Sequence, residues 1–190
     1  FKFQKLVGVL VLPIGIWIYL FRDLITEILL GDQWIEASGF IGLWGLTSAV
    51  TIVLGHYASE VYRAIGKPKL SVLAQWLHIV VLCPVIMIFV GKGFEQLCVA
   101  RSIARLELVL VQLILMRVAV KMNIGKMFLN ILPSSLAACA MMLVLLLPSP
   151  SGLGIQLLYV IFCACVYFMV LMLFPEERHI CLNLKSQFKR

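Results

Sequence analysis

Two arginines, Arg101 and Arg105, stand four residues apart within a long apolar stretch of the chain. A charged side chain at the centre of a bilayer costs about 2.5 kcal/mol or more, so these arginines must face protein or a hydrated cavity. At 3.6 residues per turn, Arg101, Arg105 and Gln112 fall within about 40° of one another and form a polar stripe ~16 Å long. Because guanidinium groups suit phosphate and carboxylate oxygens, the stripe predicts a surface that binds an anionic substrate.

Glu107 lies in the same stretch, about 200° around the helix from Arg105, so its partner must come from another helix. Two interpretations of this group of residues remain open. The side chains either handle a ligand, with Glu107 as a proton-coupling group, or form a buried polar network that holds helices together.

Two histidines could titrate within or beside the membrane. His56, Glu60 and Arg63 share one helix face at spacings of four and three residues, which suits either a proton relay or an interfacial ion cluster. His78 stands near Trp76, and its side chain could either titrate or hydrogen-bond a neighbouring helix.

The composition requires that the elements positioning these residues lie in a membrane. Of the 190 residues, 63% are hydrophobic and only 13% are charged. Soluble domains are about half apolar and a quarter charged, so the excess apolar surface must face lipid. The sequence therefore predicts an all-α fold, a polytopic transmembrane helical bundle.

A helix needs about 20 mainly apolar residues to cross the bilayer core, and the chain offers six such segments between turn signals. The predicted spans are 5–30, 35–62, 70–91, 94–120, 127–148 and 153–175, and a basic cytoplasmic tail at 176–190 follows them. Arg22, Asp23 and Glu27 fall at the end of the first segment, so its membrane-spanning part is expected to end near Phe21. Prolines within the spans are expected to kink them.

The second span contains Gly39, Gly42 and Gly45 beside several other small residues. Small residues allow helices in membranes to approach closely. We therefore expect tight helix packing here rather than contact with a ligand.

The distribution of Lys and Arg predicts the orientation, because cytoplasmic loops retain these residues. Twelve of the 16 lie in the alternate loops and ends that include Lys67, Lys121 and Arg190. Only Arg22 and Lys92 lie on the other side, so both ends of the chain are predicted to be cytoplasmic. The charge of +7 therefore reflects topology, and nucleic acid is not expected as a partner.

Neither a cofactor nor a metal is predicted. The six cysteines are scattered through apolar stretches, without a Cys-x-x-Cys motif or paired histidines at metal-binding spacing. They are expected to act as small apolar side chains. The chain starts without methionine beside its first span, and we expect a further N-terminal portion to precede Phe1.

Two segments that flank the glycine-rich span carry a resemblance to a known family. Residues 29–37 read LLGDQWIEA, and residues 62–69 read YRAIGKPK. In this order the pattern resembles the C-terminal half of the Wzx-type polysaccharide transporters, which are lipid-linked oligosaccharide flippases of the multidrug/oligosaccharidyl-lipid/polysaccharide superfamily. The similarity is clearest over residues 20–120.

The resemblance implies that the chain supplies the last six helices of a two-lobe transporter with about 12 to 14 spans. It also implies a cargo, an oligosaccharide repeat unit on undecaprenyl diphosphate that crosses the bacterial inner membrane. The implied partners are the lipid bilayer, this lipid-linked oligosaccharide and polysaccharide polymerase or export proteins. No residue role is carried over from the family to Arg101 or Arg105.

Other functions remain open. A drug or metabolite exporter of the same superfamily is the nearest alternative, although a cavity for cationic drugs should be acidic. An integral-membrane enzyme of polyprenyl-linked sugar metabolism would need an acidic metal cluster or a catalytic His/Asp group, which the short loops lack. The prediction is therefore a transporter and not an enzyme.

Overall fold

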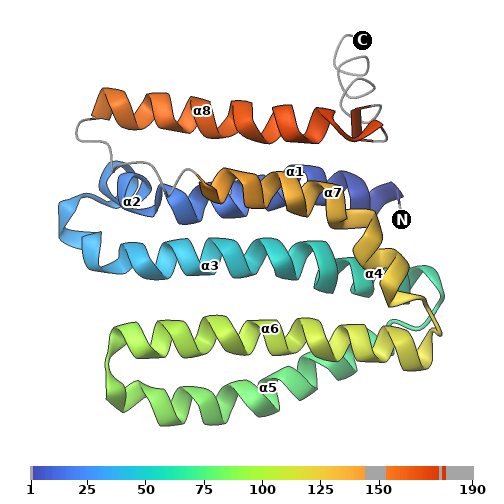
Figure 1. The fold of residues 1–190 in the computed structure, drawn as a ribbon. Coiled ribbons are helices and arrows are strands. Elements are labelled where there is room, and N and C mark those ends of the chain that lie inside the picture. Colours follow the sequence, from blue (N-terminus) through green and yellow to red (C-terminus); the bar gives the residue numbers. More distant parts are fainter. Residues whose placement is uncertain (1, 144–152, 176, 179–190) are drawn as a thin grey trace.

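The computed structural model describes residues 2–143, 153–175, 177 and 178, and this part of the chain is helical without a strand (Figure 1). The predicted all-α polytopic fold is confirmed. The predicted tail at 176–190 lies outside the described residues except for two positions, and so does the turn at 148–152.

Five helical segments in the described part are long and apolar enough to span a membrane. The α-helices are α1 (Lys2–Leu20), α2 (Arg22–Leu30), α3 (Ser38–Val50), α4 (Tyr57–Ala64), α5 (Lys69–Phe89), α6 (Phe94–Ala119), α7 (Ile124–Met142) and α8 (Leu153–Met172). The 3-10 segment Asp32–Ala37 and the π-helix Thr51–His56 join α3 and α4 into a single 33-residue segment. Helix α6 is ~39 Å long and could cross the bilayer core, but its charges make it less apolar than the other five.

The first predicted span, 5–30, is wrong in its extent, because two helices occupy this range. Helix α1 ends at Leu20, and α2 begins after Phe21, as the charges of this region predicted. Gly31 then adopts a φ of 89°, which L side chains rarely adopt, and this ends α2. The fifth helix also differs from its prediction, because it begins at Ile124, where the Asn123 side chain accepts a hydrogen bond from the Lys126 amide.

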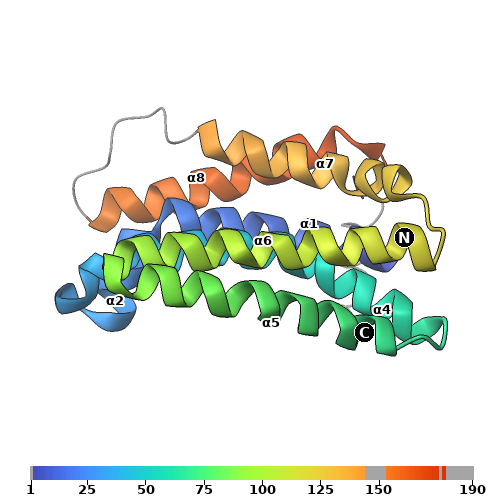
Figure 2. The same ribbon diagram turned by 90° about the horizontal axis from the view of Figure 1, so that it is seen from below.

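The helices form a row rather than a closed bundle (Figures 1 and 2). Helix α1 packs between α3 and α7, α6 packs between α3 and α5, and α8 packs mainly on α7. Helices α5 and α8 therefore stand at the two ends of the row. Most side chains of α5 are exposed, which is expected where a helix faces lipid.

Glycines allow α1 and α3 to pack closely, as the sequence predicted for the second span. A Cβ at Gly15 of α1 would overlap the Cβ of Ala49, and a Cβ at Gly45 would lie 2.6 Å from Ile18. Gly39 differs, because a Cβ there would meet nothing within 4 Å. The close approach therefore depends on Gly15 and Gly45 and not on Gly39.

Two polar contacts join elements on the side of the row where α1 begins. Lys5 of α1 forms an ion pair with Glu177 at an N–O distance of 2.9 Å, and both side chains are buried. The Lys67 ammonium donates a hydrogen bond of 3.4 Å to the Ala119 carbonyl, which joins the α4–α5 and α6–α7 turns. Both basic turns therefore lie on the same side of the row as the N-terminal end of α1 (Figure 1).

Candidate polar site between α3 and α6

The predicted polar stripe of α6 faces α3 and α4. Arg105 donates a hydrogen bond of 2.8 Å to the Ser48 hydroxyl of α3. Its guanidinium carbon lies 4.1 Å from the centre of the Trp44 ring, and that of Arg101 lies 5.3 Å from the same ring. Both arginines therefore share one aromatic platform, a contact that favours cations.

The charge of this arginine pair is not neutralised within the described part of the chain. Arg105 is partly buried and Arg101 is exposed, and neither forms an ion pair with a described carboxylate. Two cations close together raise the local positive potential, and a low-dielectric surrounding strengthens this effect. The two guanidinium groups therefore make the surface around Trp44, between α3 and α6, electropositive.

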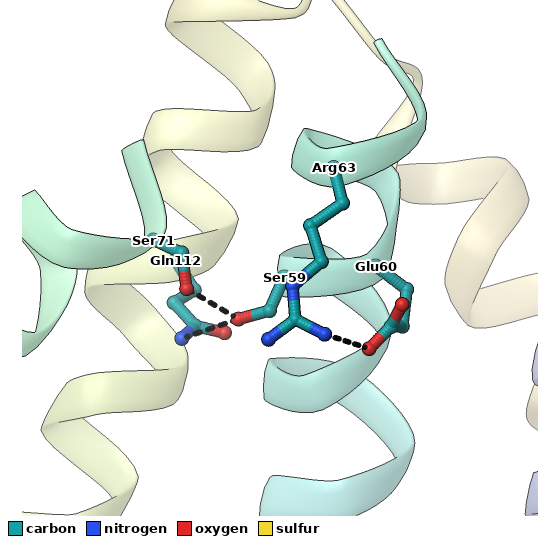
Figure 3. A network of polar contacts seen from close by, with 5 residues as sticks. All are labelled: Ser59, Glu60, Arg63, Ser71 and Gln112. Carbon is teal, nitrogen blue, oxygen red and sulfur yellow. Dashed lines mark hydrogen bonds and ion pairs between the residues drawn. The ribbon is translucent and has the colours of Figure 1, made fainter. Parts of the chain in front are cut away.

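Gln112 lies on the predicted face of α6, but it is buried beneath α4 and only 1% exposed. Its backbone carbonyl accepts a hydrogen bond of 2.6 Å from the Tyr62 hydroxyl, and its side-chain amide donates to Ser59 at 3.4 Å. Ser59 in turn contacts Ser71 of α5 at 3.0 Å (Figure 3). In this arrangement Gln112 joins α4, α5 and α6, whereas the two arginines are the members of the stripe that remain accessible.

The π-helix Thr51–His56 lies between the contacts of Arg105 and Gln112, and sequence reasoning missed it. A Cβ at Gly55 would lie 3.1 Å from the Gln112 side-chain oxygen, so glycine lets α6 approach here. The hydroxyls of Thr47 and Thr51 donate to carbonyls four residues earlier at 2.9 and 2.8 Å. Such bonds compete with the backbone hydrogen bonds of a regular helix. Two threonines four residues apart are therefore the sequence signal that could have indicated an irregular helix.

A cavity of about 610 Å³ lies between α1, α2, α3 and α6, near the helix ends where Gly31 and Gly93 form turns. Sequence reasoning did not find this cavity. Its lining includes Tyr19, Arg22, Glu36, Phe40, Glu95 and Cys98. Cys98 precedes Arg101 by about one turn of α6, so the cavity lies one turn from the arginine pair, although neither arginine lines it. Its volume lies within the ~300–1,000 Å³ of typical ligand sites.

Glu107 faces the other side of α6 and meets α5. Its carboxylate lies 3.0 Å from the Nδ1 atom of His78, and both side chains are partly buried. The prediction that its partner comes from another helix is confirmed. The pair joins α5 and α6, and its role in proton coupling stays a prediction.

The structure brings together only two of the three residues that were predicted to share a face near the end of the second span, His56, Glu60 and Arg63. Arg63 and Glu60 form an exposed ion pair at 3.0 Å (Figure 3). His56 is also exposed, and its side chain forms no hydrogen bond with a described residue. An exposed pair of this kind contributes little to stability, and the described contacts do not form a relay.

The polar site combines arginines without a described carboxylate partner, the Trp44 ring they share and a neighbouring cavity lined by α1, α2, the 3-10 segment, α3 and α6. Similarity to other proteins adds nothing to this description. No protein family model matches the chain, and no similar curated protein or solved structure was found.

Proposed function

We propose that this chain is part of a membrane transporter that moves lipid-linked oligosaccharide repeat units, carried on undecaprenyl diphosphate, across the bacterial inner membrane. The sugars would serve the synthesis of exopolysaccharide, capsule or O-antigen. The proposal combines the resemblance of residues 20–120 to the Wzx-type flippases with the geometry of the polar site.

The observation that carries the proposal is the uncompensated charge of Arg105 within a membrane helix. A guanidinium at this depth needs an anionic or hydrated surrounding, yet its described contacts are a neutral hydroxyl and an aromatic ring. A diphosphate supplies anionic oxygens that a guanidinium can bind in pairs. A cationic drug would be repelled by the same pair of arginines, so the site favours an anionic cargo.

In this proposal the face that carries Arg101 lines a cavity shared with a second lobe. Transporters commonly place their substrate site between two halves near the bilayer midplane. The exposure of Arg101 and the cavity beside Cys98 support this arrangement. Cargo would meet the arginine pair with its diphosphate while its hydrocarbon tail stays in lipid.

Deletion of the gene that encodes the chain is expected to stop polysaccharide from reaching the cell surface. Sugar-loaded undecaprenyl diphosphate should then accumulate in the membrane, because assembly continues while translocation fails. Mass spectrometry of extracted lipids and a surface polysaccharide assay measure the two effects. A strain that cannot make the repeat unit is the control and should show neither change. Normal surface polysaccharide without accumulation would refute the proposed cargo.

We also propose that the helix ends joined by the turns containing Lys67 and Lys121 face the cytoplasm. A reporter that is active only in the periplasm should be active when fused after Lys92 and silent when fused after Lys67 or Lys121. The positive-inside rule provides the physical reason. Activity after Lys121 together with silence after Lys92 would invert the orientation.

A further inference from the structure

A second cavity of about 520 Å³ lies between α1, α7 and α8, apart from the polar site. Apolar side chains line it, including Val9, Pro13, Ile14, Met141, Ala164 and Tyr167. The cavity is an open groove between helices, and both its structural cause and its occupant can be inferred from the residues around it.

Pro13 of α1 provides part of the cause. A proline inside a helix has no amide hydrogen, so the carbonyl four residues earlier, that of Val9, loses its usual donor. The Tyr167 hydroxyl of α8 donates a hydrogen bond of 2.7 Å to this carbonyl, and Tyr167 is buried. The bond holds α8 against α1 at this level. Ala164, about one turn before Tyr167 on α8, has a small side chain that leaves space beside this hydrogen bond.

The position of the cavity along the helices limits what can fill it. Its lining runs from Val9 to Trp17 of α1 and from Val160 to Phe168 of α8, within two segments that are long and apolar enough to span the membrane. This stretch of α1 is ~12 Å long. An apolar cavity does not hold water stably, and the medium at this depth is hydrocarbon. Exposed Leu10, Ile14 and Phe168 border the cavity, so it is open toward that medium.

We propose that this cavity is a binding site for an acyl chain of a bilayer phospholipid. Its lining offers an apolar surface from three helices, and the hydroxyl of Tyr167 is already bonded to the backbone. Helix α1 lies between this cavity and the α3–α6 surface that carries the arginines. The occupant is therefore a resident lipid rather than the transported cargo, and the site does not depend on the proposed transport function.

The test compares two neighbouring residues of α8 that receive the same large side chain. Ala164→Phe fills the cavity, whereas Cys165→Phe adds the ring at an exposed position outside it. The full chain is purified in detergent, and native mass spectrometry measures phospholipid that stays bound. Wild type and Cys165→Phe should retain phospholipid, and Ala164→Phe should lose at least nine-tenths of it. Equal retention by all three proteins would overturn the proposal.

A second measurement uses wild-type protein, so it remains decisive if the phenylalanine variant does not fold. The chain is placed in phosphatidylglycerol vesicles that contain a phospholipid with a photoreactive group in the middle of one acyl chain. Ile14 at the cavity and Val80 of α5 are similarly exposed apolar residues within spans. Labelling of Ile14 and the other lining residues should exceed that of Val80 severalfold. Equal labelling of Ile14 and Val80 would overturn the proposed occupant. A parallel experiment uses a photoreactive polyprenyl lipid, and labelling of Ile14 by this lipid alone would overturn it as well.

Discussion

Substitution of Arg105 by alanine is expected to abolish export of the lipid-linked cargo while the protein remains inserted and abundant. The guanidinium bridges Ser48 and Trp44 at the α3–α6 surface and has no described carboxylate partner. Its charge is therefore available to an anionic cargo. Arg105→Lys should retain part of the activity, because lysine preserves the charge but loses the paired hydrogen bonds. The measurement is export per molecule of inserted protein in wild type and both variants.

A matched control separates the transport role of Arg105 from a structural one. Arg117→Ala removes an exposed arginine from the end of the same helix and should leave export per molecule unchanged. If Arg105 only fastens α6 to α3, the alanine variant should be less abundant or less stable in detergent, and export should fall only in proportion. Normal export per molecule in Arg105→Ala would exclude a role in handling cargo.

The sequence predicted the parts of this fold that depend on local chemistry and on a regular helix period. Composition indicated the membrane, and glycine and charge patterns indicated most helix ends. The face of α6 that carries Arg101, Arg105 and Gln112 could be predicted because all three lie in one uninterrupted helix, where angular positions follow from spacing alone. The requirement that Glu107 finds its partner on another helix follows from the same geometry.

Features that depend on contacts between helices could not be predicted in the same way. Spacing placed Gln112 beside Arg105, but packing of α4 over α6 buries it and leaves Arg101 exposed. The π-helix Thr51–His56 changes the angular relation between α3 and α4, so a regular period misplaces residues across it. His78 as the partner of Glu107 and the cavity beside Cys98 also require helix pairs that no single segment encodes.

The contact between α1 and α3 leads to the second large expected effect, on folding rather than on transport. Gly15→Ala places a Cβ where the Cβ of Ala49 already lies, and the carbonyl of Gly45 is also close. Backbone and Cβ atoms cannot rotate away, so the two helices must separate, and overpacking of this kind costs about 1–3 kcal/mol. Thermal unfolding of the purified chain in detergent should therefore shift to a lower temperature.

Two companion variants distinguish the steric cause from a general effect of added methyl groups. Gly39→Ala adds the same methyl group to α3 in open space, and it should leave the unfolding temperature unchanged or raise it, since alanine favours helix by about 1 kcal/mol over glycine. The double variant Gly15→Ala with Ala49→Gly moves the methyl group from one helix to the other. It should recover most of the lost stability, because only one Cβ then occupies the contact. Failure of this exchange, together with equal unfolding temperatures for Gly15→Ala and Gly39→Ala, would mean that α1 and α3 do not meet at Gly15.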